Sequence, residues 1–155
     1  SARASRSVSP SLAVFIVRAK VREGGGVLCV QRLLEGAGFS IIEYNEFDDD
    51  TVLEVEKKLR GGNWGNEDSV YDGGAPIGCF ICFDCNPQQP SEMTQLKSRQ
   101  PDNERIFTAK YKIRDEFFRQ VIHSADNARQ SAHYIEVCMP NSLKRITDKI
   151  KTGLV

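Results

Sequence analysis

The side chains best suited to chemistry lie around His123, one of two histidines in the chain. This histidine stands between an apolar stretch and a polar turn, and several cationic side chains precede it at short range. These cations are Arg105, Lys110, Lys112, Arg114 and Arg119. An imidazole can act as a nucleophile, and lysine and arginine hold anionic phosphates through charge-assisted hydrogen bonds. The segment therefore indicates a phosphate site, with the solvated face of a basic helix as the alternative.

The other histidine, His133, is a weaker candidate. It lies in the run 132–137, which we predict to be the last strand, and an ordinary sheet residue is the simpler interpretation there. The sequence contains no GxSxG elbow, and no second histidine or cysteine pairs with His123 for a hydrolase triad. Hydrolase chemistry of the triad type is therefore not expected.

The five cysteines are an odd number in a chain large enough to need no disulfide staples, which favours a reducing compartment, the cytosol. Cys79, Cys82 and Cys85 have a spacing found in zinc sites. A structural zinc site needs four ligands, however, and no second CxxC or HxxxH pair is present. We therefore interpret residues 77–83 as a buried strand in which cysteine acts as a small apolar residue.

A run of three glycines, 24–26, precedes an expected helix. Backbone N–H groups at such a point can cradle a phosphate. The run lacks both the Gly-Lys-Ser/Thr of a P-loop and the spacing of a dinucleotide fingerprint. A flexible turn is the better interpretation.

The composition is that of an ordinary globular domain. The chain has 155 residues, 40% of them apolar, with 21 basic and 21 acidic side chains. This length fits one domain, and the balanced charge argues against a nucleic-acid binder driven by global charge. No apolar run approaches the roughly 18–20 residues that span a bilayer, so no membrane span is expected.

Hydrophobic periodicity and turn residues predict the elements that must position these groups. Strands are expected at 12–17, 39–47, 75–84 and 132–137. Helices are expected at 27–37, closed by Gly38, at 51–59 behind an acidic cap, and at 91–98, 113–121 and 141–150. This order predicts an α+β sandwich of helices on one sheet. The glycine-rich stretch 61–74, which carries Trp64, is expected to be a long functional loop.

Three parts of the chain are distinguished by composition. Residues 1–11 are rich in Ser and Arg and are expected to form a disordered arm. Residues 12–140 form the predicted domain. Residues 141–155 are expected to form an amphipathic end helix or tail, capped by Asn141 or Ser142.

Four segments together resemble the nucleoside diphosphate kinase family, over most of residues 11–138. The segment RQVIHSADN at 119–127, followed by Ser131-Ala132, is similar to the family signature around its nucleophilic histidine. The segments SLAVFIVR, LLEGAGFSII and GAPIGCF are similar to the family's first strand, its helix-to-second-strand passage and the opening of its third strand. The resemblance implies a ferredoxin-like sandwich with a four-stranded antiparallel sheet, and an oligomer.

The resemblance also implies an activity, in which an imidazole takes the terminal phosphate of a nucleoside triphosphate and passes it to a diphosphate. His123 would be the nucleophile, and Mg²⁺ would travel with the nucleotide rather than occupy a protein site. The residues implied to bind phosphates and ribose are Arg18, Lys110 and Gln120. Trp64 and Phe117 would stack on the two faces of the base, and Asp126 and Glu136 would support His123.

The sequence departs from the family at several of its site positions. Ala19-Lys20 stand where the family has Pro-Asp, Gly62 stands where it has an arginine, and Ala125 replaces a serine. Transfer would then be slower, or lost while nucleotide binding persists. The alternative function is therefore a catalytically degenerate nucleotide-binding domain, or a module that docks within a larger assembly. No specific nucleic-acid partner is expected.

Overall fold

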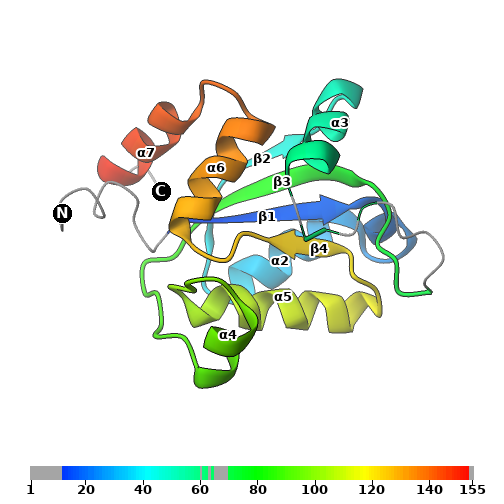
Figure 1. The fold of residues 1–155 in the computed structure, drawn as a ribbon, viewed down its shortest axis with the longest axis horizontal. Coiled ribbons are helices and arrows are strands. Elements are labelled where there is room, and N and C mark those ends of the chain that lie inside the picture. Colours follow the sequence, from blue (N-terminus) through cyan, green and yellow to red (C-terminus); the bar gives the residue numbers. More distant parts are fainter. Residues whose placement is uncertain (1–11, 60, 63, 65–69, 154–155) are drawn as a thin grey trace.

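The computed structural model describes residues 12–59, 61, 62, 64 and 70–153. Within these residues, four strands form one antiparallel sheet in the order β2-β3-β1-β4. The strands are β1 (Leu12–Arg18), β2 (Ser40–Glu46), β3 (Pro76–Phe83) and β4 (Ile122–Ser124). With its covering helices this is an α+β fold, consistent with the expected ferredoxin-like sandwich (Figure 1).

Helices cover both faces of the sheet (Figure 1). One face carries α2 (Gly26–Gly36) and α5 (Glu104–Phe117), and the other carries α3 (Asp49–Lys58), α6 (Ala128–Cys138) and α7 (Leu143–Lys151). The short helices η1 (Ala19–Glu23) and α4 (Glu92–Lys97) lie in the connections after β1 and β3. Among the described residues, no helix is both long and apolar enough to cross a membrane.

Strand β1 contributes to two cores, one on each face. Side chains that pack on the α2/α5 face are Ala13, Phe15 and Val17, and those on the α3/α6 face are Leu12, Val14 and Ile16. Because both faces are covered, every position of the strand before Arg18 is apolar. The strand predicted at 12–17 is confirmed.

The predicted helix boundaries in the first half of the chain follow local signals. The Asp48 carboxylate accepts a hydrogen bond from Thr51 N at 2.8 Å and caps α3. Gly38, which follows α2, has a φ of 104°, a conformation that favours glycine. The helices predicted at 27–37, 51–59 and 91–98 are confirmed to within a residue or two at each end.

The prediction of a last strand at 132–137 is wrong, because these residues lie in α6. Asn127 begins that helix by accepting a hydrogen bond from Gln130 N at 2.8 Å. His133 is therefore an exposed helical residue. The fourth strand is instead β4, which carries His123 and whose three residues are too few to show an alternating pattern.

The helix predicted at 113–121 has the wrong bounds, because 113–117 form only the end of α5. That helix begins earlier, where the Asn103 side chain accepts a hydrogen bond from Arg105 N at 3.1 Å. It ends at Phe118, whose φ of 54° is left-handed. The next three residues therefore lead into β4 rather than continuing the helix.

The helix predicted at 141–150 is confirmed as α7, although the Ser142 side chain makes no capping hydrogen bond. Its apolar side chains Leu143, Ile146 and Ile150 pack on the α3/α6 core. The arm predicted at 1–11 lies outside the described residues.

The cysteine-rich segment lies in β3, as predicted. Cys79 and Cys82 are buried on opposite faces of the strand, and Cys85 is exposed beyond its end. The three thiols therefore do not converge on one point.

Candidate functional site

His123 lies on β4, the edge strand beside β1, and is paired with Ile16. This register directs its side chain to the α3/α6 face, where Ile16 is buried. Its Nε2 lies 2.7 Å from the hydroxyl oxygen of Tyr134 on α6. The two rings are nearly parallel, with centroids 5.7 Å apart. Helix α6 thus fixes the orientation of the imidazole.

Tyr134 is almost fully buried. Burial raises the pKa of its phenol, and the negative charge of Asp126 adds to this effect. The hydroxyl therefore stays protonated at neutral pH, and it can either donate a hydrogen bond to Nε2 or accept one from it. When Nε2–H donates to the hydroxyl, the ring lone pair lies on Nδ1.

Trp64 also contacts the ring of His123. The two rings meet at 84° with centroids 5.5 Å apart. The indole Nε1 donates to the carbonyl of Leu59 at 2.9 Å. The indole also lies directly over Gly62, where an added Cβ would come within 2.1 Å of Cζ2 of Trp64. A side chain at Gly62 would therefore have to displace the indole.

Arg18, at the end of β1, holds the same loop. Its Nη1 donates to the carbonyl of Gly62 at 2.6 Å, its Nε to the carbonyl of Gly74 at 2.7 Å, and its Nη2 to Asp72 at 3.0 Å. The guanidinium also lies 5.1 Å from the centre of the Trp64 ring. Only 2% of the residue is exposed. Its hydrogen bonds thus fix the loop that contacts His123.

Lys110 and Arg114, one turn apart on α5, form a cationic pair near β4. Lys110 is 9% exposed, and its Nζ lies 4.8 Å from the centre of the Phe107 ring. Burial lowers the pKa of Lys110 to about 8, and the charge of Arg114 adds to this effect, while Asp126 opposes it. Within the described ranges, the Lys110 ammonium has no hydrogen bond or ion pair.

Arg114 connects this pair to the strand of His123. Its Nε and Nη2 both donate to the carbonyl of Ile122, at 3.2 and 3.1 Å. Burial lowers the pKa of its guanidinium, and the charge of Arg18 contributes. The half-buried Arg114 therefore interacts electrostatically with two buried cations, Lys110 and Arg18. Such a cluster attracts an anion.

Asp126 is the acidic group shared by these residues. Its charge acts on both Lys110 and Tyr134, so it belongs to the neighbourhood of His123. One of its oxygens accepts a hydrogen bond from Arg99 N at 3.2 Å. The Asp126 carboxylate thus offsets part of the positive charge of Lys110.

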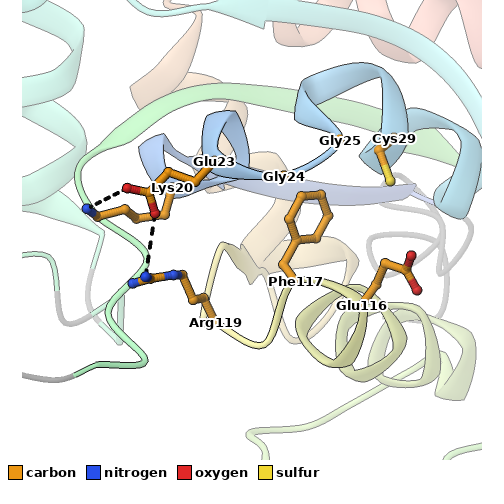
Figure 2. A pocket seen from close by; sticks show the side chains of 8 residues that line it. All are labelled: Lys20, Glu23, Gly24, Gly25, Cys29, Glu116, Phe117 and Arg119. Carbon is orange, nitrogen blue, oxygen red and sulfur yellow. Dashed lines mark hydrogen bonds and ion pairs between the residues drawn. The ribbon is translucent and has the colours of Figure 1, made fainter.

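The structure does not bring the expected base clamp together. Trp64 packs on the α3/α6 core, whereas Phe117 packs on the opposite core. Figure 2 shows the Phe117 ring in a cavity of about 400 Å³, between the start of α2 and the end of α5. An added Cβ at Gly24 would come within 2.9 Å of this ring.

At one end of the cavity in Figure 2, Glu23 forms ion pairs with Lys20 and Arg119 at 3.3 and 3.5 Å. Cys29 lies at the other end. The glycine run predicted as a flexible turn forms the wall between them.

Two further expected residues lie at the surface. Gln120 is exposed, and its backbone N donates to the carbonyl of Tyr71 at 2.8 Å. Glu136 is exposed on α6, on which Tyr134 is the residue that contacts His123. Sequence analysis missed Tyr134 because it assigned the segment to a strand. The asparagine cap and the helical spacing of apolar residues from Ala128 onward are the signals that predict a helix there.

Comparison of the sequence with protein-family models and with curated proteins found no match. Within the described part of the chain, no three His, Cys, Asp or Glu side chains are grouped to hold a metal ion.

Proposed function

We propose that this protein binds nucleoside di- and triphosphates and that His123 accepts the terminal phosphoryl group before passing it to a diphosphate. The observations that support this proposal are the hydrogen bond between His123 and Tyr134 and the cationic pair Lys110 and Arg114, of which Arg114 donates to the carbonyl of the residue before His123. In this proposal the triphosphate passes around the β4 edge of the sheet, so that the pair on α5 would neutralise part of its negative charge. The hydrogen bond holds the imidazole in a fixed orientation.

The step uses the tautomer in which Nε2–H donates to Tyr134. The Nδ1 lone pair attacks the terminal phosphorus, a bond from Nδ1 to phosphorus forms, and the bond to the bridging oxygen breaks. The nucleoside diphosphate leaves with that electron pair. A second diphosphate then takes the phosphoryl group by the reverse step. Magnesium belongs to the substrate in this scheme and is carried by the nucleotide phosphates.

The test is phosphorylation of the purified protein. Incubation with Mg²⁺ and a γ-labelled nucleoside triphosphate should give a protein label that is stable to alkali and labile to acid. His123→Gln should abolish the label, and His133→Gln should retain it, because His133 is exposed on α6 away from this contact. Thermal unfolding of both variants checks that each is folded. Label that persists in His123→Gln would overturn the proposal.

A second candidate function is nucleotide binding without transfer, within a homo-oligomer or a larger assembly. It is favoured by Arg18, whose three hydrogen bonds are made to the protein itself. Transfer would then lack one phosphate ligand. Saturable nucleotide binding without any phosphoenzyme would support this candidate over the first.

We also propose a reducing compartment, the cytosol, as the place where the protein acts. All five cysteines are free thiols, and two of them, Cys79 and Cys82, are buried in the cores on opposite faces of β3. Reactivity of only the unburied thiols toward a thiol reagent in the folded protein would agree with this arrangement.

A further inference from the structure

An open groove of about 410 Å³ lies where α5 ends and the chain turns toward β4. Its lining combines three aromatic side chains with charged groups: Tyr71, Tyr111, Phe118, Arg114, Arg119 and Asp115. It adjoins the cavity that holds Phe117 and shares Arg119 with it, but its aromatic residues are different. Its volume is within the range of sites for one small ligand.

The three aromatic rings of the groove are exposed to solvent. Tyr71 is 61% exposed, Tyr111 is 49% exposed and Phe118 is 78% exposed. Large aromatic side chains gathered at the surface are typical of binding sites, because burial against a ligand would stabilise the complex. Phe118 also has a left-handed backbone, with a φ of 54°. A bulky residue rarely adopts this conformation, and here it places a phenyl ring at the surface.

Arg114 links the groove to the neighbourhood of His123. It lines the groove and donates two hydrogen bonds to the carbonyl of Ile122, the residue before His123. Lys110 lies one turn earlier on the same helix, and its Nζ is 5.9 Å from the centre of the Tyr111 ring. The groove is therefore aromatic and adjoins the cationic pair.

We infer that this groove binds the base of the nucleotide whose phosphates reach the cationic pair, with Tyr111 and Phe118 as stacking surfaces. The inference rests on the proposed function and adds the position of the nucleoside. A flat aromatic ring attached to a polyanion matches a groove with rings and neighbouring cations. The groove replaces the clamp expected from Trp64 and Phe117, whose side chains pack on opposite faces of the sheet.

A nucleic-acid strand is a weaker match for the same groove. The chain as a whole carries no net charge, with 21 basic and 21 acidic residues. Binding a polymer of phosphates depends on many cationic contacts along its length. The single groove fits one nucleotide better than a strand.

The experiment compares a nucleoside triphosphate with inorganic tripolyphosphate, both with Mg²⁺, by titration calorimetry on the full chain. Adenosine and guanosine triphosphates should bind at least about tenfold more tightly than tripolyphosphate, because only they carry a base. Phe118→Ala should remove most of this difference and leave tripolyphosphate affinity unchanged, and Tyr111→Ala should also reduce the difference between the two ligands. Leu96→Ala is the matched control, because Leu96 is 84% exposed on α4 and does not line the groove.

Each other outcome overturns the inference in a distinguishable way. Equal affinity for the nucleotide and tripolyphosphate would exclude a base site and leave the proposed phosphate site intact. Unchanged nucleotide affinity in both aromatic variants would place the base elsewhere. If the variants bind nucleotide normally but no longer self-associate, the groove is a protein contact. If they bind nucleotide normally but bind a single nucleic-acid strand more weakly, the groove is a nucleic-acid contact. Binding of neither ligand, without phosphoenzyme, would overturn the proposed function as well.

Discussion

Two buried cations that look equivalent in the sequence have opposite environments in the structure. Arg18 donates hydrogen bonds to Gly62, Gly74 and Asp72. Lys110 contacts aromatic rings and lies near a second cation, with no hydrogen-bond acceptor among the described residues. Burial lowers the pKa of both side chains, but an ion pair and two backbone carbonyls hold the Arg18 guanidinium, whereas the Lys110 ammonium has no such partner unless an anion is bound. Burial of a cation alone is therefore no sign of a ligand site.

The difference follows from the chemistry of the two side chains. The arginine fork presents five N–H donors in a fixed plane, which suits backbone carbonyls and a carboxylate at once. Lysine presents a point charge on a flexible stem, and its pKa falls readily when it is buried. We therefore expect Arg18 to act through the loop and Lys110 to act on a ligand.

The largest effect is expected from Arg18→Ala. It leaves the Asp72 carboxylate, which is 9% exposed, without its ion pair, and it removes the donors that hold two loop carbonyls. The free energy of unfolding should fall by about 3–5 kcal/mol in a urea titration. Arg32→Ala, on the exposed side of α2, is the control and should stay close to the parent protein. Equal stability of the two variants would contradict the structural role of Arg18.

Lys110→Met should raise stability while weakening anion binding. The fall in the Lys110 pKa from 10.5 to about 8 corresponds to a cost on the order of 3 kcal/mol at neutral pH. Methionine removes this cost, so the free energy of unfolding should increase. Triphosphate affinity should fall at least about tenfold, because charge-assisted hydrogen bonds are lost. Lys112→Met, on the exposed side of α5, should change neither quantity.

The same lysine predicts a pH dependence of stability. Between pH 8 and 10.5 the unfolded chain keeps the Lys110 proton that the folded protein has lost. The unfolded state binds more protons there, so the Lys110 contribution to the free energy of unfolding rises with pH. Triphosphate affinity should fall over the first part of this window. A Lys110→Met protein with the same pH profile as the parent would contradict this prediction.

Tyr134→Phe should slow phosphorylation without changing nucleotide affinity. The variant removes the hydroxyl that lies 2.7 Å from Nε2 of His123. One neutral hydrogen bond contributes roughly 0.5–1.5 kcal/mol, so the rate of phosphoenzyme formation should fall up to about tenfold. Tyr44→Phe is the matched control, since the buried Tyr44 hydroxyl has no partner among the described residues. If Tyr44→Phe also slowed phosphoenzyme formation, the effect of Tyr134→Phe would be a general consequence of losing a buried hydroxyl.

The smallest expected effect is a difference in affinity between nucleotides that carry different bases. The Asp115 carboxylate lines the groove and can only accept hydrogen bonds. Guanine offers two neighbouring N–H groups on one edge and adenine offers one amino group. Guanosine triphosphate should therefore bind about threefold more tightly than adenosine triphosphate, and Asp115→Asn should remove the difference. A preference that persists in the variant would exclude Asp115 as its source.

The sequence predicts the elements whose patterns are long enough to be read. The apolar run of β1 and the Asp48 cap of α3 identify their elements correctly. Strand β4 is too short to show alternation, and the sequence instead predicts the last strand at 132–137, which lies in α6. This error also concealed Tyr134, because a strand directs different residues to one face than a helix does.

The environments of the two cations cannot be read from the sequence. Two of the partners of Arg18 are the backbone carbonyls of Gly62 and Gly74, which any residue type would supply, and they lie 44 and 56 positions away. The isolation of Lys110 is likewise a product of packing. A sequence pattern can thus predict which residues approach the site, whereas only the fold decides which charge is already paired.

The most direct test follows both histidine rings at once. The chain contains two histidines, so nitrogen NMR of ¹⁵N-histidine protein should resolve His123 and His133. Before nucleotide is added, the spectrum of His123 should be that of the tautomer protonated on Nε2. After addition of a nucleoside triphosphate with Mg²⁺, its Nδ1 resonance should change to that of a phosphorylated nitrogen while His133 stays unchanged. Two unchanged imidazoles at millimolar nucleotide, in a folded sample, would contradict phosphoryl transfer through His123.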